Sequence, residues 1–414
     1  MTREGPLQKQ VNSYRGDVQM KRLTLVLLAA ALVVPGLAQA QGLTMQMGNG
    51  WKFTFAGNVN VFWVFTSTDS LGATPKSTNS SIRTGLLPAF ATFAASGKEA
   101  GLDLGVHVGF GNQIQNNNGA HDQFGAQIDL RQVFLTIGLK SGMQILAGRE
   151  LGVYQRQNIL NDMTLFGVGA VGGPQGGGTT LGRIGYGYIY PNFNAQITFS
   201  SAANKQVQWS VGAFQPSVVG AFNETAIPRI EAELVWKNKT TARSTNKFMV
   251  WVGGEWQSAK NAADVSLSSI GVTAGVHADL SDLSVVVSAY TGKGIGHALG
   301  FQPTSVSGGA TPEGRPSDGG YAQVTYKMGA KTTLGVSYGV SRLKGADDGA
   351  SAGSDVTDAL LAELQMFTGG VYYQWTRSLK VVGEVSRERN DLGGIGLFAG
   401  PNRTDVSAGF MLFF

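Results

Sequence analysis

The segment RQVFLTIGLKSGMQILAGRELGVYQRQNILNDMTLFGVGAVGGPQGGGTTLGR, residues 131–183, decides how the rest of the chain is interpreted. It opens with two short apolar runs joined by Lys-Ser-Gly at 140–142, which predicts a tight hairpin. Residues 151–180 then show no strand pattern, and regular alternation resumes at 181–186. A loop of this length without secondary structure of its own is uncommon in a compact domain and usually carries function. We therefore expect loop 151–180 to be the functional part of the molecule.

The composition favours an all-β architecture. The chain has 414 residues with 59 Gly, 12 Pro and no Cys, and 14% of its residues are charged. After residue 40 no stretch approaches the length of apolar sequence that a transmembrane helix requires. Short alternating segments rich in Gly, Thr, Val and aromatic residues predict β-strands instead. The absence of Cys excludes disulfides and thiolate metal sites.

The N-terminal region has the parts of a secretory signal. Met20, Lys21 and Arg22 precede an apolar core at 23–34, and Ala-Gln-Ala follows at 38–40. We expect residues 1–19 to be an upstream mis-start, 20–40 a signal peptide and 41–414 a single β-barrel domain; a short membrane anchor is the alternative. Residues 1–40 carry five basic and two acidic side chains, so their removal lowers the formal net charge from +5 to +2. This small charge implies no nucleic-acid partner.

Alternation with period two runs through the rest of the chain. From Trp51 to Phe65 the apolar residues fall on odd positions, with mostly small or polar residues between them. The same pattern recurs at 102–110, 230–236, 270–280, 334–340 and 406–414. On the polar side of their strands lie Glu231, Glu233 and Glu384, which are candidate lumen charges. Each strand therefore has one apolar and one polar face.

The connections between the strands alternate between short and long. Short ones at 96–101, 140–142, 280–282, 328–331 and 377–378 alternate with long ones at 66–81, 111–124, 151–180, 292–320, 344–361 and 391–402. About 16 strands result, with short turns at one end and long loops at the other, which is typical of outer-membrane barrels. A soluble β-sandwich also alternates, but it needs fewer strands and would show a domain boundary in a chain of this length. We predict a transmembrane antiparallel β-barrel whose third loop folds inward.

The end of the chain favours the same interpretation. Strict parity continues to the last residue, Phe414, as though the terminus were sealed into a sheet against the strand 51–65. The residues that form this predicted assembly signal are Val406, Ala408, Phe410, Leu412 and Phe414.

Several motifs resemble the general (trimeric) porins of Gram-negative outer membranes. Residues 131–140 (RQVFLTIGLK) and 146–154 (LAGRELGVY) are similar to the porin segment that leads into the pore-constricting loop. TLGRIGY at 180–186 resembles the strand that follows that loop, and YTGKGIG at 290–296 and DGGYAQVTY at 318–326 also resemble porin signatures. The resemblance extends from about residue 50 to the end of the chain, and it is weakest in the loops.

The resemblance implies a homotrimer of 16-stranded barrels, each with a water-filled pore for small hydrophilic solutes. It also implies contact with outer-membrane lipid and with the barrel-assembly machinery. In this family, arginines on the wall face acidic groups on the inward loop. By position Arg149 and Arg183 match the wall arginines, and Arg83 and Arg131 are further candidates.

The loop departs from the family pattern because it is poor in acid. Its charged residues are Asp162 and Arg156, with Glu150 at its start. Because rings of charge at a constriction select ions by sign, we expect weak anion preference or little selectivity. A substrate-selective channel for a sugar, phosphate or organic acid is the alternative. Tyr186, Tyr188 and Tyr190 share one parity, which suggests an aromatic path for such a substrate. Tyrosines that face lipid near the rim of the barrel are, however, the commoner explanation of this pattern.

Other functions receive less support from the sequence. A non-conducting structural or adhesive barrel remains a third interpretation. No motif proposes an enzyme or a cofactor, and the four His have no metal-ligand spacing. Asp347, Asp348 and Asp355 could hold Ca²⁺ in an exposed loop, but a solvated acidic loop is the simpler interpretation.

Overall fold

The computed structural model describes residues 42–115, 127–172, 178–239, 246–308, 311–346, 360–391 and 400–414. The predicted signal peptide and the three loop aspartates lie outside the described residues. The strands are β1 (Leu43–Gln46), β2 (Lys52–Thr68), β3 (Ser77–Arg83), β4 (Ala89–Glu99), β5 (Leu102–Gln113), β6 (Gln127–Gly138), β7 (Gln144–Leu151), β8 (Phe193–Ser200), β9 (Val207–Phe214), β10 (Arg229–Lys237), β11 (Lys247–Lys260), β12 (Ser266–Leu280), β13 (Leu283–Lys293), β14 (Pro316–Met328), β15 (Thr332–Lys344), β16 (Leu360–Gln374), β17 (Leu379–Asp391) and β18 (Arg403–Phe413). No helix among the described residues is long and apolar enough to cross a membrane.

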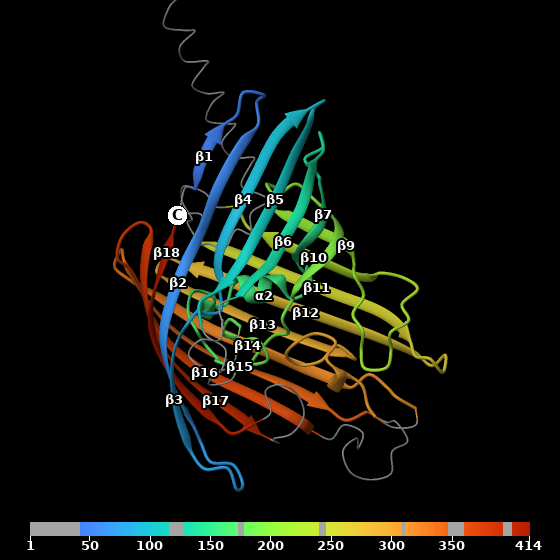
Figure 1. Ribbon diagram of the computed structural model, residues 1–414, viewed down its shortest axis with the longest axis vertical. Helices are drawn as coiled ribbons and strands as arrows, with labels where there is room; N and C mark the ends of the chain where they lie inside the picture. Colours follow the sequence, from blue (N-terminus) through green and yellow to red (C-terminus); the bar gives the residue numbers. More distant parts are fainter. Residues whose placement is uncertain are drawn as a thin grey trace, which may run out of the picture. The chain divides into compact units, whose positions relative to one another are not determined.

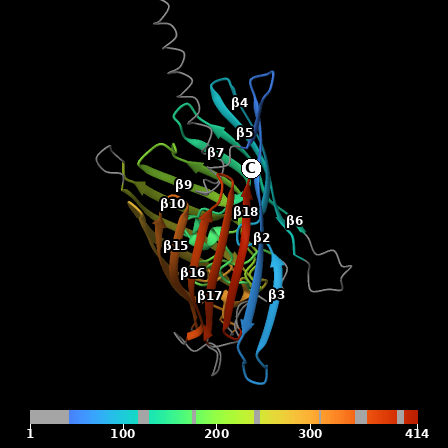
Figure 2. The same cartoon turned by 90° about the vertical axis from the view of Figure 1, so that its left-hand side faces the viewer.

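The strands form one closed antiparallel barrel of 16 strands, as the sequence predicts. Each strand from β4 to β18 pairs with its chain neighbour, and β18 pairs with β2 to close the ring. The second half of β2 pairs with β3 and its first half with β4, so these two short strands occupy a single place in the wall. Figures 1 and 2 show β2 beside β18 at this seam. Strand β1 forms an additional hairpin on β2.

The two faces of the wall follow the period-two pattern. In β10, Arg229, Glu231 and Glu233 are buried on the inner side, whereas Ile230 and Leu234 are exposed on the outer side. The odd residues of β2 face outward, and Trp63 is 44% exposed. An apolar outer face is what hydrocarbon requires, and closure leaves no strand edge unpaired in it.

The inward loop is longer than the sequence predicts. It extends from the end of β7 to the start of β8, residues 152–192, and contains the short helices α2 (Arg156–Leu160) and η2 (Met163–Phe166). The alternation at 181–186 is not a strand of the wall, because Leu181 and Gly182 pair with Ala170 inside the loop. Gly182 has a φ of 56°, and a Cβ there would lie 2.2 Å from Leu86. We call residues 152–192 the constriction loop. Figure 1 shows its helix α2 within the ring of strands.

The wall provides a docking place for this loop between β3 and β4. The inward-facing Asn60 accepts a hydrogen bond from the Gly85 N–H at 2.9 Å and donates one to the Leu87 carbonyl at 2.8 Å. The break in the strand leaves the Leu86 N–H free to donate to the Gly167 carbonyl of the constriction loop at 3.0 Å. The gap between β3 and β4 therefore provides the backbone group to which the loop binds.

Candidate functional site

The constriction loop begins with two backbone N–H groups held by one carboxylate. Val153 and Tyr154 donate to Oε2 of Glu231 on β10, at 2.7 and 2.9 Å. The other oxygen of Glu231 accepts from Arg229, whose Nε and Nη2 atoms each lie 2.9 Å away. Glu231 is buried, so a full set of partners is what allows its charge to remain there.

A second carboxylate holds the far side of the loop in the same way. Val168 and Gly169 donate their N–H groups to Oε2 of Glu384 on β17, at 2.7 and 2.9 Å. The Tyr372 hydroxyl donates to the other oxygen of Glu384. The carboxylate lies so close to Gly167 that a Cβ there would be 2.0 Å from Oε1. Backbone and wall carboxylate are therefore in direct contact.

The helix α2 is joined to the wall through a third carboxylate. Glu233 accepts from Arg156 at 2.6 Å and from Gln157 at 3.1 Å. Burial lowers the pKa of Arg156, but the adjacent Glu233 carboxylate outweighs this, so the pKa lies above its ordinary value. The three glutamates expected in the lumen do face inward, and each of them binds the loop.

Asn158 joins the loop to three wall strands. Its side chain accepts from the Trp251 indole at 2.8 Å and donates to Thr273 at 3.0 Å. Its carbonyl accepts from the Tyr321 hydroxyl at 2.8 Å. These partners belong to β11, β12 and β14. Sequence reasoning missed Asn158, because nothing in its local sequence distinguishes it from a solvated asparagine.

Asp162 and Arg183 form a buried charge pair within the loop itself. Asp162 accepts from the N–H and hydroxyl of Thr164, at 3.0 and 2.6 Å, and from Tyr188 at 2.8 Å. The Nε atom of Arg183 lies 3.9 Å from Asp162, and both side chains are inaccessible to solvent. The guanidinium also donates to Ser337 and to the Met366 carbonyl. Arg183 was expected on the wall, but it lies on the loop, because the segment that carries it is not a strand.

Three of the remaining predicted residues lie on the inner side of the wall. Arg83 is buried at the end of β3 and donates to the Gly178 carbonyl of the loop at 3.1 Å. Arg131 is the extra residue of a β-bulge in β6; it lies 2.8 Å from Asp129 and donates to the Tyr190 hydroxyl at 3.3 Å. Glu150 accepts from Gln132 at 2.7 Å.

Arg149 lies on the other side of the wall, in contrast to the expected place. It pairs with Val133 across β6 and with Ala195 across β8, and both of these residues face outward. The side chain of Arg149 is exposed on this apolar surface. The hairpin register determines the face, and the sequence motif does not contain that information.

Of the tyrosines that suggested an aromatic path, Tyr186 and Tyr188 are buried inside the barrel, and the half-buried Tyr190 contacts Arg131 on the inner side of the wall. Tyr186 donates to Glu388 at 2.8 Å, and the ring of Tyr188 packs edge-on against Tyr321 at 5.8 Å between centroids. Among the described residues, no cluster of three or more His, Cys, Asp or Glu is placed to hold a metal ion.

A closed antiparallel barrel with an apolar outer face and a loop bound inside its lumen defines an outer-membrane channel. The chain belongs to the Gram-negative porin family, whose sequence model matches residues 25–393. A comparison with curated proteins found no match.

Solved structures show the same fold. The outer membrane channel DcaP of Acinetobacter baumannii has a TM-score of 0.62 at 15% identity, covering 89% of this chain and 99% of its own. An anion-selective porin from Comamonas acidovorans has a TM-score of 0.61 at 12% identity, covering 88% and 100%. A trimer form of the outer membrane protein OmpT of Vibrio cholerae has a TM-score of 0.50 at 14% identity, again covering 88% and 100%. At these identities the likeness concerns the fold alone.

Proposed function

We propose that this outer-membrane channel allows passive diffusion of small hydrophilic solutes and ions through a lumen narrowed by the constriction loop. The observation that carries the proposal is the pair of wall carboxylates, Glu231 and Glu384, each accepting two backbone N–H groups of the loop. Non-helical backbone at membrane depth is tolerated where it is buried in protein or lines water. A loop fixed at both sides keeps a constant aperture, as passive diffusion requires. We propose no catalytic role.

Liposome swelling with neutral sugars of increasing size tests this function. Purified protein should admit small sugars quickly and exclude larger ones at a sharp limit. If proteoliposomes swell no faster than protein-free liposomes, and planar bilayers show no conductance, the diffusion channel is excluded and a structural barrel remains.

We further propose that the channel has little ion selectivity. The arginines near the constriction are largely neutralised in pairs, with Arg156 at 2.6 Å from Glu233, Arg229 at 2.9 Å from Glu231 and Arg183 at 3.9 Å from Asp162. Arg149 does not contribute to the lumen, because it lies outside. Without a ring of uncompensated charge, a constriction selects more by shape than by sign.

The reversal potential across a planar bilayer in a salt gradient measures this selectivity. A potential close to zero is expected in potassium chloride. A strong preference for either ion would contradict the proposal. A current that one sugar or organic acid blocks at low concentration would instead favour the substrate-selective channel.

We also propose that the chain assembles as a homotrimer, with its end recognised by the barrel-assembly machinery. The exposed Arg149 supports this, because an arginine facing lipid in a barrel costs roughly 2–4 kcal/mol at mid-depth. A second copy covering this face removes that cost. The trimer form known for Vibrio cholerae OmpT is consistent with such an assembly. Sedimentation in detergent should give three times the monomer mass; a monomer in the mildest detergents would contradict it.

A further inference from the structure

A second segment folds inward at the long-loop end of the barrel. Residues 294–315 connect β13 to β14, and we call their described part, 294–308 and 311–315, the lid. The lid has its own hydrogen bonds: Phe301 N–H donates to the Ile295 carbonyl at 3.1 Å, and Arg315 N–H to the Ser305 carbonyl at 2.7 Å. Ile295 and Ala298 are fully buried. The lid is therefore a folded element with a defined docking surface.

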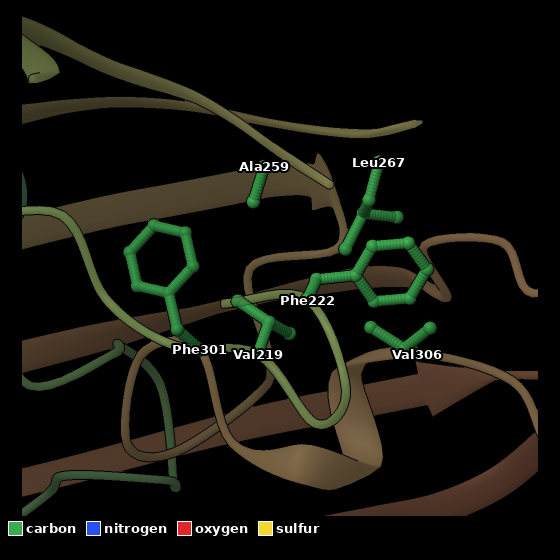
Figure 3. Packing of buried hydrophobic residues seen from close by; sticks show 6 residues of the cluster. All are labelled: Val219, Phe222, Ala259, Leu267, Phe301 and Val306. Carbon is green, nitrogen blue, oxygen red and sulfur yellow. The ribbon is translucent and has the colours of Figure 1, made fainter. Parts of the chain in front are cut away.

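The lid takes part in two apolar clusters inside the barrel. Phe301 and Val306 pack against Ala259 and Leu267, which face inward from β11 and β12 (Figure 3). Ala298 belongs to a cluster with Ala170 and Tyr186 of the constriction loop and with Leu364 and Met366, which face inward from β16. The lid therefore packs on the inner wall at β11 and β12 and shares an apolar cluster with the constriction loop.

The same cluster at Phe301 joins the lid to a third loop. Val219 and Phe222, which lie between β9 and β10, pack with Phe301 and Val306 as Figure 3 shows. Val219 and Phe222 exchange backbone hydrogen bonds at 3.1 and 3.0 Å, so this contact belongs to a closed turn. Two ordered loops therefore meet over one side of the lumen.

The lid also binds the constriction loop directly. The Tyr190 N–H donates to the Ala298 carbonyl at 2.8 Å, and Tyr190 forms a bridge with Leu299. Ile295 packs with Tyr154 and Ile189 of the constriction loop. These contacts link the lid to both ends of the constriction loop, near its start at Tyr154 and its end at Tyr190.

Phe301 connects the lid to the charged anchor of the constriction loop. Its ring lies under the Arg229 guanidinium, 5.0 Å from the centroid, and Arg229 in turn binds Glu231. Phe301 has a φ of 58°, a conformation that is rare for a bulky side chain. Backbone of this kind persists only where the surroundings over-determine it, and it is concentrated at functional sites.

We propose that the lid is a second constriction element, which together with the constriction loop sets the size limit for solutes entering from the long-loop side. The proposal rests on the diffusion function above. In this arrangement the constriction loop narrows the middle of the lumen, and the lid covers part of the space above it. Solutes pass beside the lid, so its bulk limits both their size and the current.

A shortened lid tests the proposal. Replacing residues 296–313 by a short Gly-Ser turn should raise single-channel conductance about twofold, because current follows the width of the narrowest part. The sugar size limit should rise with it. Deletion of 71–74, an exposed turn between β2 and β3, is the matched control and should change neither value. Heat-modifiable migration on gels shows whether each barrel has folded.

A milder variant covers the case in which the shortened lid does not fold. Phe301→Ala keeps the loop length but removes the ring that packs on Arg229, so it should raise the size limit less than the shortened lid does. If wild type conducts while both variants keep its conductance and its sugar limit, the lid proposal is wrong. If wild type does not conduct at all, the proposed diffusion function fails instead.

An engineered disulfide tests whether the lid is docked in the membrane. The chain has no Cys, so Tyr190→Cys with Leu299→Cys introduces a single pair at the bridged positions. We expect the pair to oxidise spontaneously, since bridged backbones bring the Cα atoms within disulfide range. The conductance should not rise on oxidation. Failure of the pair to oxidise, with both thiols accessible to a maleimide, would overturn the docked position.

Discussion

At the residue scale, the inner-wall glutamates hold the constriction loop and are not free charges in the lumen. Each binds backbone N–H groups or a cation of the loop, and Glu231, Glu233 and Glu384 are all buried. An acceptor removed from such a site leaves buried donors without partners, and each costs about 1–3 kcal/mol. Single substitutions on the wall should therefore affect the loop more than ion selectivity.

Glu384→Ala is expected to loosen the far side of the constriction loop. It leaves the Val168 and Gly169 N–H groups and the Tyr372 hydroxyl without their acceptor. Single-channel recordings should show increased current noise with an intact barrel. Glu384→Gln keeps one acceptor oxygen and should have a smaller effect, and Lys98→Ala, which breaks an exposed pair with Asp103, should have none. A quiet channel in Glu384→Ala would contradict the anchoring role.

Asp162→Asn is expected to destabilise the loop through the charge left on Arg183. Breaking a buried ion pair by removing one partner typically costs about 3–5 kcal/mol, whereas replacing both partners by neutral groups costs less. The double variant Asp162→Asn with Arg183→Met should therefore recover part of the loss. Limited proteolysis of the loop in detergent, compared among the wild type, Asp162→Asn and the double variant, measures the loss and its recovery. A double variant no more resistant than Asp162→Asn would disprove the coupling.

At the element scale, the two inward segments differ in how far the sequence predicts them. The strand faces and the strand number follow from the sequence, because lipid outside and polar surroundings inside impose period two on every strand. The end of the constriction loop cannot be predicted from the sequence, since residues 181–186 alternate like a strand, whereas Leu181 and Gly182 pair within the loop. The lid is identified only as a long connection, because its docking depends on contacts with β11, β12 and the constriction loop, which are distant in the sequence. Arg149 was misplaced for a related reason, the unknown hairpin register.

The lid should become less stable in acid because of His297. Burial lowers the pKa of His297 to about 4, and both ring nitrogens lack hydrogen-bond partners among the described residues. An undocked lid would protonate His297 near its ordinary pKa, so docking is fully stable above about pH 6.5 and weakens as the pH falls toward 4. The rate at which an engineered thiol at position 299 reacts with maleimide, divided by the rate of a free thiol at the same pH, should rise as the pH falls over that range.

The control for this effect is His297→Phe, which removes the titrating group and keeps a ring of similar size. Its thiol reactivity, divided by that of a free thiol at the same pH, should be independent of pH between 6.5 and 4. An acid dependence that persists in His297→Phe would show that another group is responsible.

At the scale of the whole molecule, the outer surface of the barrel is not uniform. Strands β6 to β8 carry the exposed Arg149 amid apolar neighbours, whereas β15, across the ring, presents residues such as Val336. A charge on a lipid face is costly and a charge between subunits is paired. Replacing Arg149 by an apolar residue should therefore weaken the oligomer if this face is a subunit interface, and should not weaken it if the face meets lipid.

Arg149→Leu distinguishes them. If the face is a subunit interface, the substitution should lower the temperature at which oligomers dissociate in sodium dodecyl sulfate. If the face meets lipid, the substitution should instead leave the oligomer unchanged or stabilise the barrel. Val336→Ala on β15 is the control for loss of packing on a lipid-facing strand and should not change oligomer dissociation.

The seam between β2 and β18 has a consequence for the kinetics of folding. Gly57 and Phe414 exchange backbone hydrogen bonds of 2.9 and 3.0 Å between nearly opposite ends of the chain. Contacts of such high sequence separation form slowly, because the loop-closure entropy must be overcome before they contribute. The barrel therefore closes late in folding, when β18 pairs with β2 after the hairpins between them have formed. Substitutions at Phe414 should delay insertion into membranes while leaving the conductance of the finished channel unchanged.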